Sequence, residues 1–132
     1  MIPTSPYRML VVDDEDSVVI AFRKYFSRHG FLVDVARERE EAEALIVTSH
    51  YDVVVADLRL SGSHGVEGLE LLRFVRAHSR GTPVAILTAY GSPEIEKAAV
   101  ELGGSVFLQK PKPLAEVAEA VAALLREPRP DA

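Results

Sequence analysis

Residues 52–57 read Asp-Val-Val-Val-Ala-Asp, with four apolar residues in a row that end directly in an acid. The run from Val53 to Ala56 lacks the apolar and polar alternation of half-exposed strands. It is typical of a strand buried on both faces of a parallel sheet. Burial disfavours a charged carboxylate, so Asp57 is hard to explain as an ordinary loop residue. The segment predicts a central parallel strand followed by a functional acid.

Short apolar runs alternate with longer amphipathic runs on both sides of this segment, a pattern typical of parallel strands joined by crossover helices. We predict five strands, at residues 8–12, 31–35, 52–56, 83–87 and 105–108. We predict five helices, at residues 16–29, 38–49, 66–77, 93–102 and 113–125. The expected fold class is therefore α/β, with a doubly wound five-stranded parallel sheet and five helices.

Local signals mark several of the expected helix ends. Gly30 follows the first helix and the Gly103-Gly104 pair follows the fourth, at positions where a chain leaves the helical conformation. Ser92 is suited to cap the fourth helix, and Pro93 is suited to its first turn. These residues support the expected order of strands and helices.

Composition narrows the possible functions of the chain. Its 132 residues are 48% hydrophobic and 27% charged, which fits one globular domain, and the formal charge of -5 argues against direct nucleic-acid binding. The absence of cysteine excludes disulfides and thiolate metal sites, and the histidines are too widely spaced for a zinc site. We place the domain at residues 1–126 and a polar, proline-rich tail or start of a linker at 127–132.

The sequence shows neither the pattern of a signal peptide nor that of a membrane span. The first residues lack the basic segment and apolar core of a signal peptide, and no apolar run approaches the roughly 20 residues of a membrane span. We therefore expect a cytoplasmic location and no membrane partner.

Polar residues stand where the expected strands end. Asp13 and Asp14 follow the first strand, Asp57 follows the third, Thr88 ends the fourth, and Lys110 follows the fifth. In an open parallel sheet the ligand site lies beyond the carboxyl ends of the strands. Three acids, a hydroxyl and an amine are thus expected to meet at one edge of the sheet.

These residue types point to metal-assisted phosphoryl chemistry. Three carboxylates brought together would repel one another unless a cation compensates them, and all-oxygen ligands favour Mg²⁺. A carboxylate at such a metal, with Lys110 opposite it, is also a plausible nucleophile toward phosphorus, because both cations neutralise the charge that repels an anionic donor. The product would be an aspartyl phosphate.

Four short motifs resemble the receiver domain of two-component response regulators. They are Val-Val-Asp-Asp-Glu at 11–15, Val-Ala-Asp-Leu-Arg at 55–59, Leu-Thr-Ala at 87–89 and Leu-Gln-Lys-Pro at 108–111. The resemblance runs from about Tyr7 to Leu125 with the motifs in the family's order, which makes it specific. It implies a flavodoxin-like, three-layer sandwich.

The resemblance implies a metal set in which Asp14 and Asp57 bind Mg²⁺ directly and Asp13 acts mostly through a bound water. The backbone carbonyl of Arg59 is expected to be a further ligand. The alternative for Asp13 and Asp14 is a purely structural role, in which paired acids stabilise the positive N-terminal end of the following helix.

The resemblance also assigns the phosphoryl site and the switch. Asp57 is the expected phosphoacceptor, Thr88 and Lys110 bind the phosphoryl group, and Phe107 matches the aromatic residue that reports the switch. Ala89 matches the small residue that leaves the phosphoryl group accessible. Phe107 is alternatively an ordinary core aromatic.

The implied partners are a histidine kinase or phosphotransfer protein as donor and a downstream effector domain or protein. The effector is expected to respond to the face formed by the fourth helix, fifth strand and fifth helix, with homodimer formation as a possibility. The chain would catalyse only its own phosphorylation and dephosphorylation, and would otherwise not be an enzyme.

The chain departs from the family pattern in two places. Ser61 replaces a usual proline, and the loop from Ser61 to Gly68 is about three residues longer than is common, so we expect it to be more mobile and to place His64 near the site. Phe107 lacks the hydroxyl of the tyrosine found in many relatives, so switching would rest on packing. Arg59 and Tyr90 are expected to tune phosphate lifetime.

Two other functions remain open from the sequence. A Mg²⁺ phosphohydrolase with an aspartyl intermediate typically has two acids spaced two residues apart after its first strand, whereas Asp13 and Asp14 are adjacent. A degenerate receiver that serves only as a binding scaffold would have no need of the charged pocket.

Overall fold

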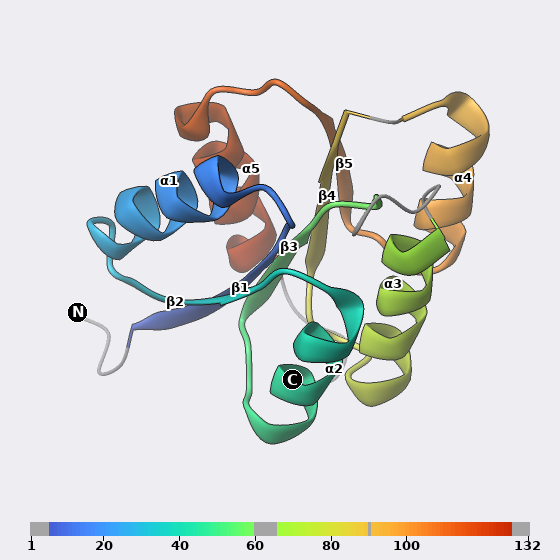
Figure 1. The fold of residues 1–132 in the computed structure, drawn as a ribbon, viewed down its shortest axis with the longest axis horizontal. Helices are drawn as coiled ribbons and strands as arrows, with labels where there is room; N and C mark the ends of the chain where they lie inside the picture. The colour runs from blue at the N-terminus through green and yellow to red at the C-terminus, as the bar shows by residue number, and fades with distance from the viewer. Residues whose placement is uncertain (1–5, 60–65, 90, 128–132) are drawn as a thin grey trace.

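The strands and helices alternate along the chain in the computed structural model, which describes residues 6–59, 66–89 and 91–127 (Figure 1). The strands are β1 (Tyr7–Val12), β2 (Phe31–Ala36), β3 (Val53–Ala56), β4 (Val84–Thr88) and β5 (Val106–Gln109). The helices are α1 (Asp16–Ser27), α2 (Arg39–Thr48), α3 (Val66–His78), α4 (Pro93–Glu101) and α5 (Leu114–Arg126). The predicted α/β fold class is confirmed, and each boundary lies within two residues of its prediction.

The five strands form one parallel sheet in the order β2-β1-β3-β4-β5. The strand order reverses between β1 and β3, where Val12 pairs with Ala56. The residues that follow these two strands therefore leave the sheet side by side. This is the switch point at which open α/β sheets place their ligands.

Helices cover both faces of the sheet and enclose two separate cores. Figure 1 shows α1 and α5 on one face and α2, α3 and α4 on the other. Successive strand residues point to opposite faces, so neighbours in one strand enter different cores. The core under α1 and α5 receives Met9, Val11, Val53, Val55, Ala85 and Leu87 from the sheet. The other core receives Leu10, Val12, Val54, Ala56, Val84 and Ile86.

The helix-end signals behave as the sequence indicates. The Ser92 hydroxyl accepts a hydrogen bond from the Ile95 backbone N–H at 3.2 Å, and Pro93 opens α4. Gly30 and Gly103 have φ angles of 88° and 101°, a conformation that side chains with a Cβ rarely adopt. The predicted cap and stop residues are therefore confirmed.

The histidines in the described part of the chain, His29, His50 and His78, are exposed, whereas His64 lies outside the described residues. Within the described residues, no helix combines the length and apolar character needed to cross a bilayer.

Arg76, near the end of α3, joins that helix to two loops. Its guanidinium donates to the carbonyl oxygens of Ser79 at 3.1 Å, Arg80 at 2.7 Å and Thr82, all just beyond the helix. It also donates to the carbonyl of Gly103 at 3.1 Å, beyond the end of α4. Arg76 thereby satisfies backbone acceptors in the two loops that follow α3 and α4.

We predict that Arg76→Met, which keeps the aliphatic stem but removes the guanidinium, lowers the free energy of unfolding by about 2 kcal/mol, because carbonyl acceptors lose a charged donor. Urea denaturation measures the change. The matched control is Arg73→Met on the exposed side of α3. Equal stability of the two variants would contradict the role of Arg76.

Candidate functional site

Two buried acids stand at the carboxyl edge of the sheet. Asp13 follows β1 and Asp57 follows β3, and the side chains of both are 4% exposed. Their backbone N–H groups continue the sheet pattern, since Asp13 donates to Ala36 at 3.0 Å and Asp57 donates to Val12 at 2.9 Å. The strands themselves therefore fix both carboxylates at adjacent positions.

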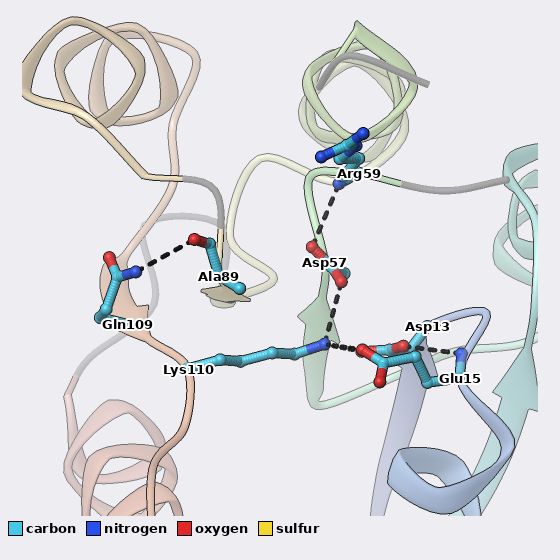
Figure 2. A network of polar contacts seen from close by, with 7 residues as sticks. All are labelled: Asp13, Glu15, Asp57, Arg59, Ala89, Gln109 and Lys110. Atoms are coloured by element: carbon cyan, nitrogen blue, oxygen red, sulfur yellow. Dashed lines mark hydrogen bonds and ion pairs between the residues drawn. The ribbon is translucent and has the colours of Figure 1, made fainter. Parts of the chain in front are cut away.

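Lys110 lies between these acids (Figure 2). Its Nζ atom is 2.7 Å from Asp13 Oδ2, 3.0 Å from Asp57 Oδ2 and 3.0 Å from Glu15 Oε1. The backbone N–H of Lys110 donates to the Thr88 carbonyl at 2.9 Å, which anchors the lysine to the end of β4. The Lys110 side chain thus contacts acids from two segments of the chain, while its backbone is held at the ends of β4 and β5.

Burial and hydrogen bonding shift the pKa values of Asp13 and Lys110 in opposite directions. Burial raises the pKa of Asp13 above its ordinary value, while hydrogen bonds from Lys110 and the Glu15 N–H partly offset that rise. Burial alone would lower the pKa of Lys110, but hydrogen bonds to Asp13, Asp57 and Glu15 outweigh it and raise that pKa. Lys110 is therefore firmly charged, and it compensates the buried acids.

The carboxylates of Asp13, Glu15 and Asp57 offer oxygen atoms that all lie within 4.8 Å of one another. The combined negative charge of these three acids is larger than the single positive charge of Lys110. Clustered carboxylate oxygens of this kind could hold a hard divalent cation. Asp14, between Asp13 and Glu15 in the chain, is exposed to solvent.

Thr88 is the last residue of β4, and Arg59 lies three residues beyond the end of β3. Thr88 is completely buried at the end of β4, two residues past Ile86, which pairs with Ala56. The Arg59 backbone N–H donates to Asp57 Oδ1 at 3.1 Å, and the Arg59 side chain is half-buried. Arg59 therefore contacts Asp57 directly, and Thr88 ends the strand that neighbours β3.

Phe107 is half-buried in β5 and packs against the core beneath α2, α3 and α4. A Cβ atom added to Gly91 would lie 2.9 Å from its ring. The neighbouring Gln109 side chain donates to the Ala89 carbonyl at 3.2 Å. The β4–α4 segment that follows Thr88 is therefore in direct contact with β5.

Comparison with known protein families decides the classification. The family model described as the response regulator receiver domain matches residues 9–122. This chain is a response regulator receiver domain. The resemblance recognised in its four sequence motifs is confirmed.

Individual relatives agree with this classification. The receiver domain is 35% identical over 126 residues to the response regulator MprA of Mycolicibacterium vanbaalenii, covering 96% of this chain and 53% of MprA. It is 33% identical over 119 residues to the transcriptional regulatory protein CusR of Escherichia coli, covering 90% of this chain and 51% of CusR. The chain thus spans about half the length of these relatives.

A solved structure shows the same fold. The non-phosphorylated HemR receiver domain of Leptospira biflexa superposes with a TM-score of 0.86 at 27% identity, covering 94% of this chain and 98% of the HemR domain. The similarity extends over nearly the whole receiver domain.

Glu15 is a residue of the receiver pocket to which the sequence analysis gave no role. Its backbone N–H donates to Asp13 Oδ1 at 2.9 Å, which turns the chain so that the Glu15 side chain reaches Lys110. Its position directly after two expected site acids was the available signal. Its pairing with a residue 95 positions away could not be read from spacing.

Some predictions lie outside the described residues of the receiver domain. These are the proximity of His64 and the mobility of the longer loop, of which residues 60–65 are not described, and the tuning role of Tyr90. Gly68, predicted to close that loop, lies instead in the first turn of α3, where an added Cβ would lie 2.2 Å from the Leu58 Cα. No side chain fits there, so α3 begins directly against the backbone next to Asp57.

We predict that Lys110→Met lowers the free energy of unfolding of the metal-free receiver domain by about 3 kcal/mol at neutral pH, because it leaves two buried carboxylates without their cation. The loss of its hydrogen bond removes an effect that lowers the pKa of Asp13. A raised carboxyl pKa in the folded state destabilises the fold as pH rises, so the deficit should shrink toward about pH 4.

Urea denaturation without divalent ions at both pH values measures this deficit. Lys112→Met removes the same charge two residues away and serves as the control. A deficit that is equal for the two variants, or independent of pH, would show that the acids do not depend on Lys110.

Proposed function

We propose that this receiver domain is a phosphorylation-dependent signalling switch in which Asp57 accepts a phosphoryl group from a histidine kinase or phosphotransfer protein. The observation that carries the proposal is the buried Asp57 carboxylate at the sheet edge, held 3.0 Å from the Lys110 ammonium. A buried acid beside a fixed cation is suited to attack an anionic donor, because the cation reduces the repulsion.

The donor set fits Mg²⁺, since clustered carboxylate oxygens are the ligands that this ion prefers. We propose that Asp14, Asp57 and the Arg59 carbonyl would bind it directly and that Asp13 would act mostly through water. When bound, the ion would neutralise charge on the phosphoryl group.

The side chains of the domain have distinct parts in the transfer. A carboxylate oxygen of Asp57 attacks phosphorus, and the O–P bond forms as the P–N bond to the donor histidine breaks. The electron pair of that bond stays on the imidazole nitrogen. Lys110 pairs with the transferred group, and the Thr88 hydroxyl donates a hydrogen bond to it.

The switch is proposed to run from Thr88 to the face formed by α4, β5 and α5. Thr88 leads into the segment that contacts β5 through Gly91 and Ala89, so a shift of Thr88 toward the phosphoryl group would alter the contacts of Phe107. Partner affinity would then change only as far as partners distinguish the two arrangements.

The partner is proposed to be a downstream effector domain or protein. MprA and CusR are about twice as long as this chain, and CusR is a transcriptional regulatory protein. We propose a cytoplasmic location, no direct nucleic-acid contact by this domain, and chemistry confined to its own phosphorylation and dephosphorylation. Residues 127–132 would serve as a tail or the start of a linker.

We predict that the wild-type protein gains one phosphoryl group when it is incubated with Mg²⁺ and acetyl phosphate, whereas Asp57→Ala gains none. Intact-mass spectrometry measures the gain. Chelation of Mg²⁺ should abolish it, because Asp57 and the donor would then repel each other without the divalent cation.

Two other results would favour the alternative functions. No gain of mass in the wild type, together with no Mg²⁺ binding, would indicate a scaffold. Sustained release of phosphate from an external ester such as para-nitrophenyl phosphate would indicate a phosphohydrolase.

We predict that Gly91→Ala displaces the Phe107 ring in the unphosphorylated protein, because the new Cβ would lie within 3 Å of that ring and of the Gln109 side chain. Aromatic NMR spectra of Phe107 measure the displacement. Glu94→Ala, at an exposed position of α4 three residues from Gly91, is the control for an indirect effect of substitution in this region. An unchanged Phe107 signal in Gly91→Ala would argue against contact between the β4–α4 segment and this ring.

A further inference from the structure

Glu15 occupies the N-cap position of α1 but does not cap the helix. Its backbone is extended, with φ −87° and ψ 118°, and its side chain makes no capping hydrogen bond. An N-cap side chain ordinarily accepts from the N–H groups of the first turn, which stabilises the helix. The Glu15 carboxylate instead lies 3.0 Å from Lys110 Nζ.

The contact with Glu15 completes the hydrogen bonding of Lys110. An ammonium has three N–H donors, and those of Lys110 have acceptors on Asp13, Asp57 and Glu15. A phosphoryl oxygen on Asp57 would need one of these donors. Lys110 must therefore release an acceptor before it can pair with the phosphoryl group.

Exposure decides which acceptor is released most easily. The side chains of Asp13 and Asp57 are each 4% exposed, whereas that of Glu15 is 58% exposed. A buried carboxylate that loses its cation has no water to replace it, but water can solvate Glu15 at once. Phosphorylation converts the Asp57 carboxylate into an acyl phosphate, so Asp13 and Glu15 are the acids that remain carboxylates, and of these Glu15 is the acceptor whose loss costs least.

We propose that Glu15 is a positioning residue that holds the third donor of Lys110 in the unphosphorylated state and is exchanged for a phosphoryl oxygen when Asp57 is modified. The proposal rests on the proposed function of Asp57. It assigns to Glu15 a contact made in the ground state and broken during transfer.

The exchange can be observed in NMR spectra of the lysine ammonium groups. The chain has four lysines, which simplifies assignment of the Lys110 signal. In the protein without Mg²⁺ or donor, Glu15→Ala should shift that signal, while Glu119→Ala, an exposed acid on α5, should not. With Mg²⁺ and beryllofluoride, a mimic of the phosphoryl group, the Lys110 signals of wild type and Glu15→Ala should coincide.

Kinetics supply an independent test. Because the Glu15 contact stabilises only the ground state, its removal should raise the rate of phosphorylation by acetyl phosphate about threefold. Glu15→Asp keeps the charge but is one methylene shorter. Provided that its unphosphorylated spectrum shows the contact broken, it should be as fast as Glu15→Ala.

The outcomes separate this proposal from the proposed function. A Lys110 signal that Glu15→Ala leaves unchanged, or one that still differs with beryllofluoride, overturns the exchange. A rate of phosphorylation that is unchanged or slower in Glu15→Ala also overturns the exchange. So does a Glu15→Asp variant that has lost the contact with Lys110 but is phosphorylated at the wild-type rate. A wild type that gains no phosphoryl group refutes the proposed function and the exchange with it.

Discussion

The compensation of two buried carboxylates by one ammonium is the interaction on which this receiver domain depends. Asp13 and Asp57 lie at the ends of the neighbouring strands β1 and β3, where water is scarce and unpaired charge is costly. Lys110 arrives from β5 and is anchored through its backbone to Thr88. The charge balance therefore joins strands that are not all neighbours, and the same contacts assemble the candidate phosphoryl site.

Topology makes this interaction possible. Pairing of Val12 with Ala56 sets the two acids side by side, although 44 positions separate them in the chain. The close approach of Gly68 to Leu58 seats α3 against the residue after Asp57. A rigid backbone around the acid preorganises the site, so chemistry at Asp57 would require little rearrangement of the central strands.

The sequence predicted the fold well because parallel strands buried on both faces leave an unambiguous apolar pattern, as at Val53 to Ala56. Asp57 was predictable because an acid directly after such a strand is hard to explain otherwise. Glu15 was not predictable, because acids at helix starts are common and its partner comes from a distant strand end. Arg76 was not predictable either, because its acceptors are backbone carbonyls whose positions only the folded loops define.

Exposure in the pocket is graded, and the gradient has a chemical consequence. Asp13 and Asp57 are buried, Lys110 is 13% exposed at its side chain, and Asp14 and Glu15 face solvent. Charges in the buried layer interact strongly and exchange partners at high cost, whereas those in the outer layer are screened and exchange readily. Arrival of a cation or donor should therefore rearrange the outer acids first and leave the inner pair in place. A switch built this way changes its contacts without unfolding its core.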